Sequence, residues 1–438
     1  MTLLSTAFRE AVKKTKDPDQ INEMTYSVSY PTGFPNFDFV NGYIQDINGQ
    51  KRFELGLSDG SINMIISDSG CGKTTLATQA ACNIVRGFET SCVFYEQAEV
   101  GTNIQRIKNI TNFDSDEEFK KKFIVRDAGI TTESIYDRVR MVHDIKVGNP
   151  EKFTYDTGIV DEFGKKIIKY QPTVFLIDSV KLVLSKKNAE EDYTNNLSMA
   201  QAAKTNSEYY TKMVPLCRSA NIIMILINHI TTDINTGPFM KKPEFPYLKV
   251  GEHISGGKSL VFIQNTIFRL DIKSKLSPDD GLGITGSIVN LDVVKSRTNK
   301  TSKARCLLVF DQDKGYDPDL SLFVMLKEEK LIEGAGAYLR IPGSDVKFAQ
   351  KNFKNLLNTN PEFYNAFASF CINHLSSKLI DEYNAIQDAN NHKANNSQVY
   401  LNALKNISFE SNSKLKEAGG TEPNLSELEP VIEDYDNN

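Results

Sequence analysis

Residues 60–86 combine an apolar run, a loop of small residues and a helix-forming segment, and this order constrains the fold more than any other stretch. The apolar residues of the predicted strand are Ile62, Met64, Ile65 and Ile66. The predicted helix has apolar residues at four-residue spacing, which are Leu76, Ala80 and Ile84. Gly87 marks its end. A strand, a short loop and a helix in succession are typical of an α/β fold.

The loop matches the latter half of the phosphate-loop pattern, in which backbone N–H groups and a helix N-terminus surround phosphates. Glycine is needed where a phosphate leaves no room for a Cβ atom, and Lys73 would place its charge between two phosphates. Thr74 would supply a hydroxyl to Mg²⁺. The full pattern begins with glycine, where this chain has Ser67. The residues expected to bind nucleotide are Ser67, Asp68, Ser69, Gly70, Cys71, Gly72, Lys73, Thr74 and Thr75.

Composition limits the compartment and the partners. The 438 residues are 40% hydrophobic and 24% charged, as in globular proteins that bury a sizeable core. A net charge of −5 argues against a coat of nucleic acid but allows a local basic patch. The chain has no apolar run of membrane-spanning length and no secretion signal, and its six cysteines form no CxxC pair. We therefore expect a cytoplasmic protein with reduced thiols, no zinc site and no membrane partner.

Three further predicted strands are each followed by polar residues that could carry chemistry. They are residues 92–95 with Glu96 and Glu99, residues 174–177 with Asp178, and residues 222–227 with His229. Because the carboxyl ends of parallel strands meet at one edge of a sheet, we expect these side chains to converge there. Asp178 would hold Mg²⁺ through water, unless it is only a turn or helix-cap acid. Glu96 or Glu99 would polarise an attacking water, and we expect Glu96 because it is nearer the strand.

Several separate stretches of this chain resemble the RecA family of DNA recombinases, most closely its UvsX-like branch from T-even phages. Residues 31–38 are similar to the lead-in to the family's phosphate loop. Residues 226–229 resemble the strand whose last polar residue senses the γ-phosphate, which gives that catalytic role to His229. Residues 256–260 and 268–272 resemble the end of the family's second DNA-binding loop and the strand beyond it.

Two more stretches carry the resemblance. Lys295 and Arg297 resemble the basic pair that reaches the nucleotide of a neighbouring subunit, although both could be surface charges at a strand edge. Residues 327–338, KEEKLIEGAGAY, resemble the lead-in to a small C-terminal lobe. Since ATP chemistry does not require this last stretch, it favours the recombinases over other nucleotide hydrolases.

The resemblance implies a RecA-like phosphate-loop NTPase core with a mostly parallel central sheet. We expect four segments, which are a short N-terminal helix and linker at 1–29, the ATPase core at 30–325, a small α/β lobe at 326–380, and a linker with an acidic tail at 381–438. By composition alone, residues 388–398 predict a linker, and the acids after residue 421 predict a solvated tail. Residues 153–170 alternate in polarity and predict an exposed hairpin.

The function implied is an ATP-dependent recombinase that forms helical filaments of its own copies on single-stranded DNA and exchanges strands with double-stranded DNA. ATP and Mg²⁺ would be its cofactors, and the acidic tail could bind a single-strand-binding protein or a loading mediator. Loops at 185–198 and 231–257 would contact DNA. The DNA-binding residues would be Lys186, Lys187, Lys241, Lys242, Lys249, Gly256 and Gly257, although the lysines could simply be solvated.

The alternative is a ring-forming replicative helicase of the DnaB type, which shares the core and a similar Pro-Thr-Gly-Phe lead-in at residues 31–34. Against it stand the absence of an N-terminal primase-binding domain and the match at 327–338. A third class, ATP-binding regulators of the KaiC or RadA type, would need a second ATPase copy or a zinc knuckle, and the sequence has neither pattern.

Overall fold

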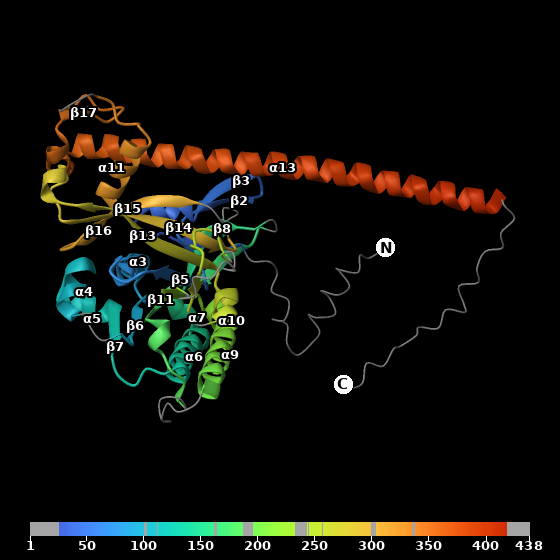
Figure 1. Ribbon diagram of the computed structural model, residues 1–438, viewed down its shortest axis with the longest axis horizontal. Coiled ribbons are helices and arrows are strands. Elements are labelled where there is room, and N and C mark those ends of the chain that lie inside the picture. The colour runs from blue at the N-terminus through green and yellow to red at the C-terminus, as the bar shows by residue number, and fades with distance from the viewer. Residues whose placement is uncertain are drawn as a thin grey trace. The chain divides into compact units, whose positions relative to one another are not determined.

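A computed structural model describes residues 26–99, 103–111, 113–161, 164–186, 196–232, 243, 245–255, 257–298, 304–334 and 338–417, apart from the side chains of 196–204, 257–259 and 391–417. The predicted strand–loop–helix unit is present (Figure 1). Strand β5 spans Ile62–Ser67, and helix α3 spans Lys73–Arg86 with Gly87 as its C-cap. Residues 68–72 between them are called here the glycine loop.

Strand β5 lies inside a ten-stranded sheet with the order β16-β15-β14-β13-β5-β11-β10-β6-β7, and β12 pairs with β11. The strands are β6 (Val93–Gln97), β7 (Phe123–Arg126), β10 (Thr173–Asp178), β11 (Ile222–Thr232), β12 (Glu252–Ile254), β13 (Thr266–Leu276), β14 (Gly286–Ser296), β15 (Arg305–Asp311) and β16 (Gly315–Asp317). Neighbours from β13 to β7 run parallel, whereas β13 to β16 pair antiparallel. The protein is therefore α/β with a mostly parallel central sheet, as predicted.

The register of the parallel strands brings their carboxyl ends to one edge. Ser67, the last residue of β5, lies opposite His229 in β11. Asp178, the last residue of β10, lies opposite Gln97 in β6. Strand β11 continues past its predicted end at residue 227 to Thr232 and pairs there with β12. His229 is consequently held within a strand.

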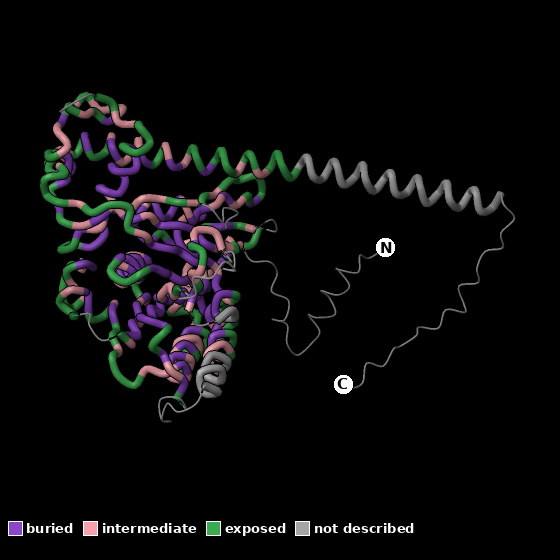
Figure 2. The backbone as a smooth tube through the Cα atoms, viewed as in Figure 1, coloured by how far each residue is buried: buried purple, intermediate pink, exposed green. Residues whose placement is uncertain are grey.

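Helices cover both faces of the sheet because its central strands are apolar on both sides. Alternate residues of β5 enter different cores, with Ile65 on the face of α3 and Met64 on the opposite face. The first face also carries α4 (Ile104–Thr111) and α5 (Asp116–Lys122), and the second carries α6 (Thr132–Gly148), α9 (Asn196–Ala220) and α10 (Gly257–Ile263). Figure 2 shows the buried residues concentrated in the sheet and in the inner sides of these helices.

The chain before β5 forms a small layer of short elements. They are β1 (Ser29–Tyr30), α2 (Pro35–Val40), β2 (Tyr43–Ile47), β3 (Gln50–Glu54) and β4 (Leu57–Ser58). Strand β1 pairs with β4, and β2 pairs with β3, both antiparallel. Phe37 of α2 packs edge-on against Phe268 of β13, at 4.7 Å between ring centroids, which fixes this layer to the central sheet.

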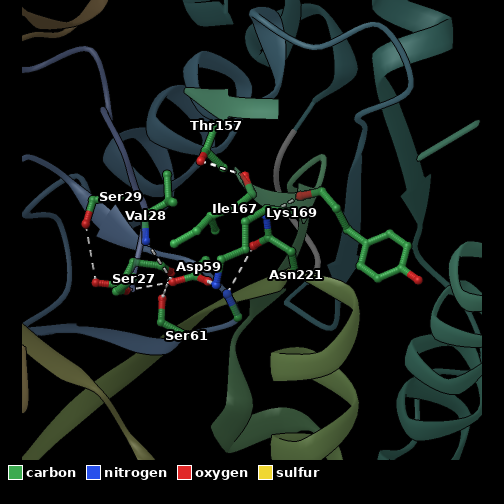
Figure 3. Close-up of polar contacts among 12 residues, drawn as sticks. Ser27, Val28, Ser29, Asp59, Ser61, Thr157, Ile167, Lys169 and Asn221 are labelled. Carbon is green, nitrogen blue, oxygen red and sulfur yellow. Dashed lines mark hydrogen bonds and ion pairs between the residues drawn. The ribbon is translucent and has the colours of Figure 1, made fainter. Parts of the chain in front are cut away.

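Residues 153–170 form the predicted hairpin, but it is docked rather than exposed throughout. Strands β8 (Thr154–Val160) and β9 (Lys166–Tyr170) follow α7 (Pro150–Phe153), and Ile159 and Ile167 are buried. Lys169 Nζ lies 2.7 Å from Asp59 Oδ2, and Asp59 Oδ1 accepts a hydrogen bond from Ser27 Oγ (Figure 3). The hairpin thereby holds the start of the N-terminal layer.

After β16 the chain builds a lobe around a group of aromatic rings. Its elements are α11 (Pro318–Glu328), β17 (Leu339–Arg340), β18 (Lys347–Phe348), α12 (Phe353–Thr359) and the first part of α13 (Pro361–Glu417). Short 3₁₀ turns lie at Val180–Leu182, Pro278–Asp280 and Gln350–Asn352. Helix α13 buries every fourth residue of this part, namely Phe363, Phe367, Cys371, Leu375 and Leu379. This spacing places them on one helix face.

The chain divides into two compact units, Met1–Leu379 and Ile380–Asn438. In the second unit the described residues continue α13 to Glu417, so the prediction of a linker at 388–398 is wrong. Asparagine-rich composition suggested the linker, but residues 362–417 contain no glycine or proline, the two residues that oppose a helix most strongly.

Four predictions lie wholly or partly outside the described residues. They are the N-terminal helix, the acidic tail after residue 421, most of the expected DNA-binding loop at 185–198 and part of the one at 231–257. All six cysteines are free thiols, and Cys71, Cys82, Cys217 and Cys371 are buried. Within the described ranges, no helix combines the length and the apolar character needed to cross a bilayer.

Candidate functional site

Lys73 is the first residue of α3, and its ammonium group turns back onto the glycine loop. Its Nζ donates hydrogen bonds to the carbonyl oxygens of Ser67 (3.2 Å) and Asp68 (2.9 Å) and to Ser67 Oγ (3.1 Å). Burial lowers the pKa of Lys73, and the nearby carboxylates of Asp178 and Glu99 oppose that shift. Ser67, which replaces the glycine of the pattern, is therefore a direct partner of the lysine.

The amide groups at the start of α3 face an open loop. Gly72 is the N-cap residue with φ +80°, and as a glycine it offers no side chain to cap the helix. Gly70 is also left-handed, with φ +83°, a conformation that glycine adopts without strain. Asp68, Ser69 and Gly70 are exposed. Uncapped N–H groups at a helix N-terminus attract anions, so this end of α3 can receive a phosphate.

Asp178 ends β10, and two hydroxyl groups orient its carboxylate. Thr74 Oγ1 and the Tyr95 hydroxyl donate to Oδ2, at 2.7 Å and 3.1 Å. Burial raises the pKa of Asp178, and these hydrogen bonds oppose the shift. Its Oδ1 atom is buried and has no hydrogen-bond partner among the residues that the structure describes. Thr74 and Asp178 therefore fit a Mg²⁺ site, which needs few protein ligands when phosphates supply the others.

Glu96 does not lie with these residues. It is inside β6 rather than after it, and its carboxylate is buried on the face of the sheet opposite to Tyr95. There it forms an ion pair with Arg138 of α6. A carboxylate that is already neutralised by a guanidinium is poorly placed to polarise water, so the geometry does not support the preference for Glu96.

Glu99 lies at the carboxyl edge instead. Its backbone N donates to the carbonyl oxygen of Asp178 at 2.8 Å, which ties the end of β6 to the end of β10. Its Oε2 atom is 3.6 Å from His229 Nε2, and its side chain is half exposed. Since β11 and β5 are neighbours, Glu99 and His229 lie together beside the glycine loop.

Lys295 and Arg297 lie at the end of β14 and cover the last turn of α10. Lys295 Nζ donates to the carbonyl oxygen of Val261 at 2.6 Å, and Arg297 Nη2 donates to that of Phe262. Burial and the neighbouring Arg297 lower the pKa of Lys295 to about 8. Cations at a helix C-terminus stabilise its free carbonyl groups. The sheet register places Lys295 opposite Ile267, whose parallel neighbour is Met64 in the first half of β5, whereas the glycine loop follows the end of β5.

The expected DNA-binding residues are only partly within the described chain. Lys186 and Lys249 are exposed, and their backbone N–H groups donate to Glu133 and Glu252. Gly257 is the first residue of α10. Lys187, Lys241, Lys242 and Gly256 lie outside the described residues.

Three further residues shape the site and are not evident from sequence motifs. Tyr95 orients Asp178, Arg138 neutralises Glu96, and Tyr316 of β16 lies beneath the glycine loop. Strand alternation was the available signal for Tyr95, because it places Tyr95 and Glu96 on opposite faces, whereas no sequence signal identifies Arg138. No sequence signal joins residue 316 to residue 71. A comparison with models of known protein families finds no match.

Proposed function

We propose that this protein binds and hydrolyses ATP at the carboxyl edge of its central sheet. The observation that carries the proposal is the 2.7 Å hydrogen bond between Thr74 and Asp178, which joins the start of α3 to the end of β10 and leaves Asp178 Oδ1 unused. Thr74 and Asp178 would hold Mg²⁺, which neutralises phosphate charge when bound. The N–H groups of the glycine loop and Lys73 would hold the phosphates.

Glu99 is the carboxylate we assign to the attacking water, in place of Glu96. It is half exposed at the carboxyl edge, and a general base must be able to reach the proton that it removes. His229 lies beside it and would contact the terminal phosphate. These two side chains therefore complete the set that hydrolysis needs, together with Lys73 and Asp178.

We further propose that hydrolysis serves a DNA recombinase with a RecA-like core, which forms filaments on single-stranded DNA and pairs them with homologous double-stranded DNA. The strand order supports such a core, because β11 lies between β5 and β10 and these parallel strands end at one edge, where ligands bind in open α/β sheets. The resemblance at 327–338 also supports it, since this stretch begins at the end of α11, a helix of the aromatic lobe.

Electron microscopy with single-stranded DNA and a slowly hydrolysed ATP analogue tests the assembly, and ATPase assays with and without DNA test the chemistry. We expect continuous helical filaments and DNA-stimulated hydrolysis. Lys73→Ala should lower turnover by at least about 100-fold, because phosphate charge is left without its cation. Lys152→Ala on α7 is the matched control, since that lysine is exposed. Closed rings in the micrographs would favour the helicase. Wild-type ATP turnover by Lys73→Ala would contradict the assignment of the ATP site to Lys73 and the glycine loop.

A further inference from the structure

Tyr316 lies directly beneath the glycine loop although it is far away in the sequence. Its hydroxyl donates to the carbonyl oxygen of Cys71 at 2.8 Å, and its side chain is buried. A Cβ atom at Gly72 would lie 3.0 Å from the Tyr316 hydroxyl oxygen and 3.2 Å from Cε2. The tyrosine therefore fills the space behind the loop, and glycine at position 72 is required for that packing as well as for its left-handed backbone.

The hydrogen bond to Cys71 also fixes the direction of a peptide group. The carbonyl of Cys71 and the N–H of Gly72 belong to the same trans peptide unit, so they point in opposite directions. When the carbonyl turns inward to Tyr316, the N–H of Gly72 turns outward to the open side of the loop. This is the side on which the uncapped start of α3 can receive a phosphate.

Tyr316 is itself held in place by the helix that follows the loop. Gln79 of α3 accepts a hydrogen bond from the backbone N of Tyr316 at 2.8 Å and donates one to its carbonyl oxygen at 3.2 Å. The rings of Phe34 and Phe310 pack against the tyrosine, at 6.2 Å and 5.2 Å between centroids. Strand β16, α3 and the glycine loop thus form one connected unit.

We propose that Tyr316 is a positioning residue that holds the glycine loop in its phosphate-binding conformation through Cys71. This inference rests on the proposed nucleotide site. It adds a residue of the antiparallel part of the sheet to a site otherwise built at the parallel strands. The buried Tyr316 hydroxyl is bonded to the carbonyl oxygen of Cys71, so its effect must act through the loop and appear as weaker binding of any ligand that uses the loop.

Binding of ADP and of inorganic pyrophosphate to Tyr316→Phe tests the proposal. The variant keeps the ring and removes the hydroxyl, and we expect about a tenfold loss of affinity for both ligands, the usual effect of one lost hydrogen bond. Because pyrophosphate has no base or sugar, an equal loss of affinity for ADP and for pyrophosphate would show that the defect lies in the phosphate-binding loop. Tyr210→Phe is the matched control, since the buried Tyr210 hydroxyl has no partner among the described residues. Unchanged affinities in Tyr316→Phe would overturn the proposal.

Alkylation of Cys71 gives a second test that needs no nucleotide. Cys71 is a buried residue, 6% exposed, so its thiol should react slowly with iodoacetamide in the wild type. We expect about tenfold faster modification of Cys71 in Tyr316→Phe, with Cys217 in the α9 core unchanged as the internal reference. Equal rates at Cys71 in the two proteins would overturn the positioning role. Cys71 could be modified faster in Tyr316→Phe while the wild type binds neither ADP nor pyrophosphate. This result would support the positioning role of Tyr316 and would contradict only the proposed nucleotide site.

Discussion

Asp38 is a buried carboxyl group whose Oδ1 accepts hydrogen bonds from Thr32 N at 2.8 Å and from Thr32 Oγ1 at 2.6 Å. Burial raises its pKa to about 7 in spite of these bonds. In the unfolded chain the same group ionises near pH 4. Between about pH 4 and pH 7 the folded state therefore binds the extra proton, and stability falls as the pH rises through this range.

Asp38→Asn should remove this pH dependence, because the amide oxygen still accepts both hydrogen bonds and cannot ionise. Relative to the variant, we expect the wild type to lose up to about 4 kcal/mol of unfolding free energy between pH 4 and pH 8, from a shift of about three pKa units. Urea denaturation at several pH values measures it. Asp46→Asn changes an exposed carboxyl group, so this control should show the same pH dependence of stability as the wild type. If the unfolding free energy of Asp38→Asn depended on pH as strongly as that of the wild type, the Asp38 carboxyl group would not be the source of the pH dependence.

Glu99 and Glu96 should give opposite results when each is changed to glutamine. Glu99→Gln should lower ATP turnover by at least about 100-fold with little effect on folding, because it removes the proposed base at an exposed position. Glu96→Gln should cost about 2 kcal/mol of stability, since it weakens the pair with Arg138, and should leave turnover nearly intact. Steady-state ATPase assays and thermal unfolding of both variants decide between them. The reverse pattern would return the catalytic role to Glu96.

At the scale of elements, Lys146 joins the end of α6 to two other segments. Its buried Nζ donates to the carbonyl oxygens of Gln171 at 2.7 Å and Ala220 at 2.8 Å. Lys146→Met keeps the length of the side chain but leaves both carbonyls without this donor, so we expect a loss of about 2 to 4 kcal/mol of unfolding free energy. Chemical denaturation measures the loss, and Lys152→Met on α7 is the exposed control. A loss as small as that of the control would mean that water replaces the ammonium group.

Elements with a strong local signal could be predicted from the sequence. Strand β5 and helix α3 follow the apolar pattern closely, and β10 follows its continuous apolar run. The hairpin at 153–170 follows its alternating polarity. In each case the residues that decide the structure are neighbours in sequence, so periodicity and stop signals are sufficient.

Features that depend on distant partners could not be predicted. The pairing of Glu96 inside the protein depends on Arg138, which lies on α6 and is distant from Glu96 in the sequence. The docking of the β8–β9 hairpin depends on Asp59, far upstream of Lys169. The helix at 388–398 was missed for a different reason, because its composition is typical of linkers while only the lack of glycine and proline favours a helix.

At the scale of the whole molecule, Lys295 and Arg297 lie at the end of β14 and hydrogen-bond the last turn of α10. In the proposed filament, this pair would act on the nucleotide of a neighbouring subunit. We predict that Arg297→Ala, and more so the double change with Lys295→Ala, leaves nucleotide binding by the free subunit intact. The same changes should remove most DNA-stimulated ATPase activity, because the cation supplied to a neighbour is lost. Equilibrium nucleotide binding and DNA-stimulated turnover measure the two effects.

A mixture of this variant with Lys73→Ala provides the control for that prediction. Each variant retains the half of the shared site that the other lacks, so the mixture should regain activity above either protein alone. The measurement requires co-assembly on DNA, which labelled subunits can report. Co-assembly without any gain in turnover would show that the basic pair acts only within its own subunit.

The bond between Tyr316 and Cys71 joins residues 245 positions apart, and this separation sets an order of events during synthesis. A ribosome adds about 5 to 20 residues per second, so about 12 to 50 s pass between translation of the loop and translation of its support. A nascent chain that ends before Gly315 has every residue of the glycine loop and none of the strand beneath it. We therefore expect the loop to reach its final form only after the strands before β16 have been made, so that the proposed binding of nucleotide would begin when the sheet is nearly complete.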